Sequence, residues 1–262
     1  MRLHLQRIAV PGLRPTAASA AAAAAGATVM ATPHDSYSSS IGVLGCKINT
    51  DRVAYWPDTV TCDNICVSLS YQDRQLYLLR IDQSGGAHDV SYDAWNYLVT
   101  GKSATQAPTA GGGIAMTAQA ADPAQCRDLI RTPDGRLPLS AANSMNYLSN
   151  CLGRADSWVA RNYALWNVLD PLCTLGRDEV CTLDWPAQNQ AACPHQLGLP
   201  DVLKSTPVYN IRYPSGERVL ARGVGTSDTG TGTGDKENAA AARSVAGSLL
   251  CLVGGTILLA IW

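Results

Sequence analysis

Eight cysteines in the middle of the chain place the strongest constraint on how it can fold. An even number of cysteines in an exported chain indicates a disulfide framework. Zinc binding by the Cys62-x3-Cys66 pair is disfavoured, because no second cysteine pair or histidine pair follows at a matching distance. We therefore expect disulfides and neither a metal nor another cofactor, although eight cysteines allow about 105 pairings. The eight are Cys46, Cys62, Cys66, Cys126, Cys151, Cys173, Cys181 and Cys193.

Residues 1–31 have the composition of a secretory signal peptide. Three arginines precede an alanine-rich run, and the small residues around Val29-Met30-Ala31 suit cleavage after Ala31. Two early prolines and the weak hydrophobicity of alanine leave a mitochondrial presequence or a disordered leader as alternatives. We favour secretion because it agrees with the cysteine content.

Residues 223–262 have the order of a GPI-attachment signal. Small residues at 230–234 precede a polar spacer at 235–243 and an apolar tail at 244–262, which contains the ninth cysteine, Cys251. This order matches what GPI attachment requires, with Gly232 as the first choice of attachment residue and Asn238 as the second. The alternative is a tail anchor or a single transmembrane helix, but no basic residue follows Trp262 to hold a cytoplasmic end.

Charge argues against a nucleic-acid partner. Between residues 32 and 232 the chain has 15 Lys and Arg against 19 Asp and Glu, and no basic stripe. The segment 226–233 is a flexible linker by composition or a short O-glycosylated stalk.

Hydrophobic periodicity predicts strands in the first half of the chain. Strands are expected at 52–57, 65–72 and 74–82, the last two joined by a turn at Gln72-Asp73, and a further strand at 114–122. Between them a helix is expected to begin after Ser91 and to end at Gly101.

The second half changes its period. Segments 140–152 and 156–169 predict two helices, the second starting at Asp156 and carrying Trp158 and Trp166 on one face. Residues 172–199 show no clear period and are rich in cysteine. A hairpin is expected at 206–221, about the turn at 214–216.

An ordered set of features lies between Gly45 and Cys126. Cys66-Val67-Ser68-Leu69 enters one strand, a second strand ends at Asp82-Gln83, glycines follow, Asp89 precedes a helix, and a late strand ends at Cys126. This set resembles the barwin-like double-psi β-barrels, the family of plant barwins, expansins and related endoglucanases. Ser84 stands where barwins have a cysteine, and the expansin His-Phe-Asp motif is reduced to Ala87-His88-Asp89.

With this resemblance we expect an α+β chain in five parts. A signal peptide (1–31) precedes a small double-psi β-barrel (41–126). A disulfide-rich helical extension with a terminal hairpin (127–222) follows. The linker and GPI-attachment region (223–243) and the hydrophobic tail (244–262) complete the chain.

The resemblance implies that Asp89 lies at the bottom of a polysaccharide groove. If the chain is an enzyme, Asp89 and Asp82 are the candidate catalytic residues. The alternative roles are structural: Asp89 would cap the helix, and Asp82 would bind the backbone of the glycine turn. Aromatic rings can stack on the apolar faces of sugars. The expected ligand-binding residues are Tyr55, Trp56, Tyr92 and His88.

Hydrolysis is harder to support. Inverting glycosidases need two carboxyl groups about 6.5–9.5 Å apart, and Asp51 and Asp58 are merely near the expected position of the second. A Ser84-His88-Asp89 triad is disfavoured because the chain has no Gly-x-Ser-x-Gly motif.

These observations lead to one main hypothesis and two alternatives. The chain is expected to be a monomeric, exported, GPI-anchored protein of the cell surface or cell wall, of a kind found in fungi, that binds or remodels chitin or β-glucan without hydrolysis. The alternatives are a glycoside hydrolase, and a secreted effector or inhibitor that uses the barrel as a scaffold.

Overall fold

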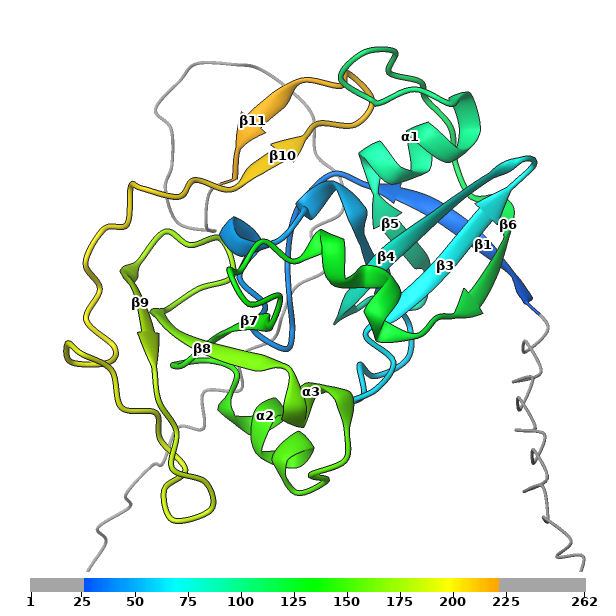
Figure 1. Ribbon diagram of the computed structural model, residues 1–262. Coiled ribbons are helices and arrows are strands. Elements are labelled where there is room, and N and C mark those ends of the chain that lie inside the picture. The colour runs from blue at the N-terminus through cyan, green and yellow to red at the C-terminus, as the bar shows by residue number, and fades with distance from the viewer. Residues whose placement is uncertain (1–25, 222–262) are drawn as a thin grey trace, which may run out of the picture. The chain divides into compact units, whose positions relative to one another are not determined.

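Six strands close into a barrel in the computed structural model, which describes residues 26–221 (Figure 1). Their order is β1-β5-β2-β4-β3-β6, and β6 pairs with β1 to close the ring. The pairs β1–β5 and β2–β4 are parallel, and the other neighbours are antiparallel. The barrel strands are β1 (Ala27–His34), β2 (Val53–Trp56), β3 (Cys66–Tyr71), β4 (Arg74–Gln83), β5 (His88–Ser91) and β6 (Ile114–Ala120).

The hairpin of β3 and β4 confirms the sequence prediction. Its register runs from Cys66 opposite Leu79 to Tyr71 opposite Arg74, and Gln72 takes a positive φ of 54° in the turn. Helix α1 (Tyr92–Thr100) also begins after Ser91 and ends at Gly101, as expected. It ends there because Gly101 adopts φ 79° and donates its N–H to the carbonyl of Tyr97.

Helix α1 lies against the barrel through its apolar face. Trp95 and Leu98 are fully buried there, and the indole N–H of Trp95 donates to the carbonyl of Ala31 at 3.1 Å. The barrel core therefore continues into the helix.

Strand β1 extends the barrel beyond its predicted start at residue 41. Residues Ala27–Ala31 pair with Ala118–Ile114 of β6. Cleavage after Ala31 would remove this pairing, so the predicted cut is not compatible with the closed barrel. The residues before Gly26 and after Ala221, including Gly232 and Asn238, lie outside the described residues.

The second part of the chain is built on a sheet. Strands β7 (Leu137–Ser140) and β8 (Tyr163–Val168) are parallel, and β9 (Gly176–Cys181) is antiparallel to β8. The predicted hairpin at 206–221 is present as β10 and β11. The remaining elements are α2 (Met145–Leu152), α3 (Trp158–Arg161), β10 (Tyr209–Ile211), β11 (Arg218–Leu220) and the 3₁₀ helices η1 (Gly45–Lys47), η2 (Thr50–Arg52) and η3 (Pro123–Leu129).

The prediction of a helical extension is wrong for most of this part. The first helix is shorter than expected, since residues 137–140 form β7. The second lasts one turn, begins at the cap residue Ser157 instead of Asp156, and ends at Asn162 with φ −133°. Trp166 therefore lies on β8. Pairing with strands on both sides outweighs the weak local helix propensity of this segment.

All eight expected cysteines form disulfides, as predicted. The bonds are Cys46–Cys173, Cys62–Cys151, Cys66–Cys126 and Cys181–Cys193. The first two join the part before residue 126 to the part after it. One hydrophobic cluster also runs across this boundary, from Val53 and Leu79 to Leu139 and Leu165. The barrel and the second sheet therefore share a core, and residue 126 does not separate two independent domains.

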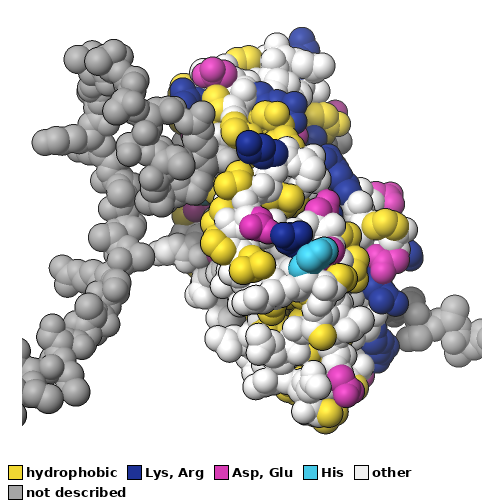
Figure 2. Space-filling view, turned by 90° about the vertical axis from the view of Figure 1, so that its left-hand side faces the viewer, with side chains coloured by type: hydrophobic (Ala, Val, Ile, Leu, Met, Phe, Trp, Pro, Cys, Tyr) yellow, Lys and Arg dark blue, Asp and Glu magenta, His cyan; other side chains and the backbone are white. Residues whose placement is uncertain are grey.

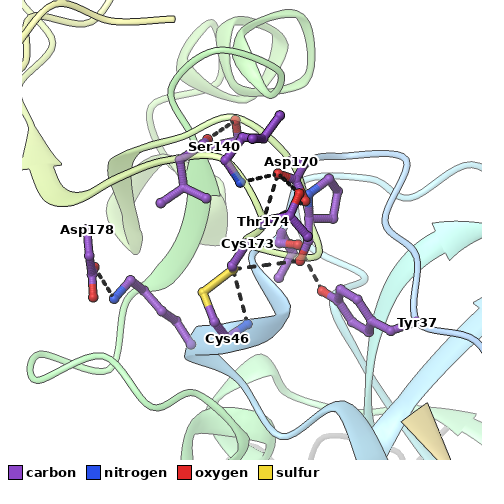
Figure 3. Close-up of a disulfide and its surroundings, with 12 residues drawn as sticks. Tyr37, Cys46, Ser140, Asp170, Cys173, Thr174 and Asp178 are labelled. Atoms are coloured by element: carbon purple, nitrogen blue, oxygen red, sulfur yellow. Dashed lines mark hydrogen bonds and ion pairs between the residues drawn. A yellow bond between two sulfur atoms is a disulfide. The ribbon is translucent and has the colours of Figure 1, made fainter. Parts of the chain in front are cut away.

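Figure 3 shows how the Cys46–Cys173 disulfide is embedded. The backbone N–H of Cys46 points to the sulfur of Cys173 at 3.4 Å. Next to the bond, Asp170 accepts the backbone N–H and the hydroxyl of Thr174. The disulfide thus fixes η1 against a turn whose own hydrogen bonds are satisfied. Across residues 26–221, no helix is both long and apolar enough to cross a membrane.

Candidate functional site

Four polar residues form a row across neighbouring barrel strands. Thr32 of β1 lies beside Asp89 of β5, Asp89 beside Tyr55 of β2, and Tyr55 beside Asp82 of β4. Register partners on adjacent strands point to the same face of a sheet. Both predicted aspartates thus belong to one site, with the ring of Tyr55 between them.

A β-bulge places Asp82 in this row. The register of β2 and β4 runs from Ala54 opposite Arg80 to Tyr55 opposite Asp82, so that Ile81 is passed over. Without the extra residue, Tyr55 would lie opposite Ile81, and Asp82 would point to the other face. The bulge is therefore what brings the second carboxylate to the site.

The carboxylate of Asp82 is occupied by the protein itself. One oxygen accepts the backbone N–H groups of Ser40 at 2.9 Å and Gln83 at 2.8 Å. The other accepts the hydroxyl of Ser38. These bonds fix the segment after β1 to the end of β4, which agrees with a structural role, although the donors precede the glycine turn instead of lying in it.

Asp89 is in a different situation. Its side chain is half-buried, and one oxygen accepts the hydroxyl of Thr32. It does not cap α1: Ser91 is the N-cap residue, and Asp89 accepts no backbone N–H within the described part of the chain. Asp89 therefore keeps acceptor capacity for a ligand.

Tyr55 is nearly inaccessible, with 4% of its surface exposed. Its ring lies 4.7 Å, centroid to centroid, from that of His34. Burial raises the pKa of Tyr55 above its ordinary value, and Asp82 and Asp89 add to the effect, while a hydrogen bond with the backbone of Ser38 opposes it. The hydroxyl thus stays protonated at neutral pH.

A small cavity lies beside this row. It has a volume of about 20 Å³, and His34, Asp51, Tyr55 and Ser91 are among the residues that line it. This volume admits one water molecule and no sugar ring. A ligand as large as a sugar could therefore reach this row only from the outer surface, at Asp89 and Thr32.

The other predicted ligand-binding residues do not offer an exposed platform. Trp56 is 8% exposed and Tyr92 is 1% exposed. His88 is half-buried and contacts Trp56 edge-on, at 5.2 Å between ring centroids. Because neighbouring residues of a strand face opposite sides, His88 points away from the face of Asp89. Of the four, Tyr55 alone lies in the row.

The turn between β4 and β5 is exposed. Gly86 has a φ of 136°, which favours glycine, and a side chain at Gly85 or Gly86 would meet no atom within 4 Å. The hydroxyl of Ser84 donates to the carbonyl of Ala87 within the turn. Ser84 therefore serves the turn, and no Ser84-His88-Asp89 relay is formed.

The other acids suggested for a second carboxylate have different surroundings. Asp58 pairs with the buried guanidinium of Arg80 at 3.2 Å. Asp51 lies at the small cavity, where burial raises its pKa and the charge of Asp93 raises it further. Among residues 26–221 no group of three or more His, Cys, Asp or Glu side chains is placed to hold a metal ion.

Sequence reasoning missed Thr32, His34 and Ser38. These residues follow the expected cleavage position, and no motif marks them. No family of known proteins matches the chain, and neither a characterised protein nor a solved structure is significantly similar to it.

Proposed function

We propose that the protein is exported, is attached to the cell surface through a GPI anchor, and binds or remodels chitin or β-glucan of the cell wall without hydrolysing it. The observation that carries this proposal is the unequal state of the two barrel aspartates. Asp89 is half-buried with a single side-chain partner, whereas Asp82 is buried and binds three donors of the protein.

The same inequality argues for binding without hydrolysis. Neighbouring strands lie about 4.8 Å apart, so the backbones of Asp89 and Asp82 are separated by about 10 Å, with Tyr55 between them. An inverting mechanism needs a second carboxylate that is free to activate water across an open groove. Asp82 is not free, because both of its oxygens are bonded within the protein. Asp89 can still accept hydrogen bonds from sugar hydroxyls.

The barrel is proposed to be of the barwin-like double-psi type. Supporting features are closure by six strands with two parallel pairs, and the disulfide between Cys66 at the start of β3 and Cys126 shortly after β6. The glycine turn and Asp89 of the sequence resemblance also lie where β4 passes to β5. The resemblance begins at Gly45 and lacks β1, which is the strand that completes the ring.

Sedimentation with insoluble chitin and β-glucan tests the proposal. We expect the wild-type protein to be retained on at least one polymer, and Asp89→Asn to weaken retention several-fold, since it replaces a charged acceptor of hydrogen bonds by a neutral amide. Asp128→Asn is the matched control, because Asp128 is exposed and its substitution removes the same charge away from the row of Asp89. Thermal unfolding of each variant shows whether the fold is retained.

Each other outcome contradicts a defined part of the proposal. Release of soluble sugar by the wild type, lost in Asp89→Asn, would show a hydrolase. Absence of retention on both polymers would favour a secreted effector or inhibitor. Equal retention of Asp89→Asn and wild type would show that Asp89 does not contribute to binding.

A further inference from the structure

A second groove lies on the sheet of β7, β8 and β9, away from the aspartate row. Its volume is about 590 Å³, within the range of about 300–1,000 Å³ typical of ligand sites. Residues of β8, β9, α3 and the loop before β7 line it. Figure 2 shows the side of the molecule on which β9 lies, with hydrophobic side chains interspersed among charged ones.

The groove has an apolar, aromatic floor. Trp166 of β8 and Val180 of β9 are register partners, and Val180 is 53% exposed. Leu183 continues this surface past the end of β9. The ammonium group of Lys47 stacks on Trp166 at 3.6 Å from the ring centroid and pairs with Asp178 at 2.6 Å. Trp166 is therefore held in place before any ligand arrives.

Two side chains at this floor have hydrogen-bond donors that the protein leaves largely unused. Arg161 makes no ion pair within residues 26–221, and its one hydrogen bond there is a long contact of 3.4 Å from its Nε to a backbone carbonyl. Tyr163 also lines the groove and its hydroxyl makes no hydrogen bond to the described residues. A ligand that fits must supply acceptor atoms as well as an apolar face.

The charges of the rim favour an anion. Arg136 and Asp134 pair with each other at 3.3 Å, and together with Arg161 they leave the lining with one net positive charge. Guanidinium groups bind carboxylates through paired N–H donors. The unpaired Arg161 is thus the group to which a carboxylate would bind.

We infer that this groove binds an acidic polysaccharide whose sugar units carry carboxylates. The apolar face of a sugar ring lies on Trp166 and Val180, and its carboxylate binds Arg161. This inference rests on the proposed function, because it takes wall polysaccharide as the class of ligand, and it adds a second site with a different charge preference.

Binding of soluble polygalacturonate to the full-length protein tests the inference. Intrinsic tryptophan fluorescence and affinity electrophoresis measure the affinity for it, alongside sedimentation with chitin and β-glucan. We expect Arg161→Gln to weaken binding of polygalacturonate about tenfold, since it removes hydrogen bonds to a charged group. Arg212→Gln is the matched control, because Arg212 is exposed on the distant hairpin and its ion pair with Glu217 is long, at 3.6 Å.

A second variant tests the floor of the groove. Val180→Asp places a negative charge beside Trp166 at a position that is 53% exposed, so it should abolish polygalacturonate binding with the fold intact. Binding by the wild type should also weaken as salt concentration rises. Neither variant should alter retention on chitin or β-glucan, which is attributed to the row of Asp89.

The outcomes separate this inference from the proposed function. Retention on chitin or β-glucan without any binding of polygalacturonate overturns the inference and leaves the proposed function standing. Binding of polygalacturonate that Arg161→Gln weakens, without retention on either neutral polymer, supports the groove and contradicts the proposed role of Asp89. Equal affinities of Arg161→Gln and Arg212→Gln overturn the inference.

Discussion

The barrel and the sheet of β7, β8 and β9 reach order by different means. The barrel is closed by continuous backbone pairing, and one disulfide, Cys66–Cys126, joins its strand β3 to η3, which follows β6. The second sheet has three short strands, and three of the four disulfides bond it to the barrel side or close a loop at its end. Regular pairing leaves a periodic pattern in the sequence, whereas order supplied by disulfides does not.

Removing the Cys46–Cys173 bond should cause one of the largest losses of stability and tests how the two parts are joined. The double variant Cys46→Ala/Cys173→Ala removes a cross-link between residues that are 127 positions apart in the sequence. With Cys62–Cys151 still present to shorten the effective loop, we expect the free energy of unfolding to fall by about 4 kcal/mol. Urea unfolding measures the change. Because the two parts share one hydrophobic cluster, a single cooperative transition is expected.

The disulfide Cys181–Cys193, which closes a short loop, is the control for loop length. Its sequence separation is 12 residues, so the corresponding double variant should lose about 3 kcal/mol. Two separate unfolding transitions in the first variant would show that the barrel and the second sheet fold independently, against the shared core.

Tryptophan truncation compares the two cores directly. Trp95 is fully buried between α1 and the barrel, so Trp95→Ala should cost about 4 kcal/mol. Trp166 is partly buried on β8 and should cost about half as much when truncated. Denaturant unfolding measures both, and a larger loss for Trp166→Ala would place the main core under the second sheet.

Acid should loosen the second sheet at one defined place. The pKa of Glu179 is lowered to about 2, chiefly by the amide of Asn167 and also by the ring and backbone N–H of His195. A lowered folded pKa contributes stability that is present above pH 4.5 and is lost as the pH falls towards 2. Hydrogen exchange around His195 should therefore quicken over this window, and Glu179→Gln should remove the pH dependence. The barrel amides near Val67 should not respond, and a parallel response there would contradict the local origin.

The smallest expected effect has the opposite sign and belongs to η2, which leads directly into strand β2 of the barrel. Burial and the charge of Asp93 raise the pKa of Asp51. A raised folded pKa for an acid contributes stability that is present at low pH and is lost as the pH rises through it. At neutral pH the ionised group is therefore unfavourable, and Asp51→Asn should raise Tm by about 2 °C at pH 7. Calorimetry at pH 7 and pH 3 measures the difference, which should shrink or reverse at pH 3.

Much of the barrel could be predicted because its local and long-range signals agree. Alternation in residues 66–71 and 74–83 marks a hairpin whichever partners complete the sheet, and Gly101 ends a helix through its own backbone freedom. Segment 163–168 has no such agreement. Its conformation is decided by pairing with β7 and β9, which the residues of the segment itself do not reveal.

The candidate site could be predicted in part for a related reason. Asp82 and Asp89 stand out beside the glycine turn, and the structure brings both to one row. Their partners did not stand out: Thr32 enters through parallel pairing with β5, and the position of Asp82 depends on a bulge at Ile81. Trp56 is buried in the core that the barrel shares with α1, and Tyr92 is covered by Tyr213 and Pro214 of the terminal hairpin. Periodicity alone reveals neither contact.

The position of β1 has a consequence for maturation. The first five residues of this strand lie within the expected leader, and the strand is also the one that bridges β5 and β6. A protease that trimmed the chain to residue 32 would leave β6 with unpaired backbone groups along its length. Such an open edge invites pairing with other chains. A cut upstream of Ala27 would keep β1 paired with β6, whereas a cut after Ala31 would open the edge of β6 to other chains.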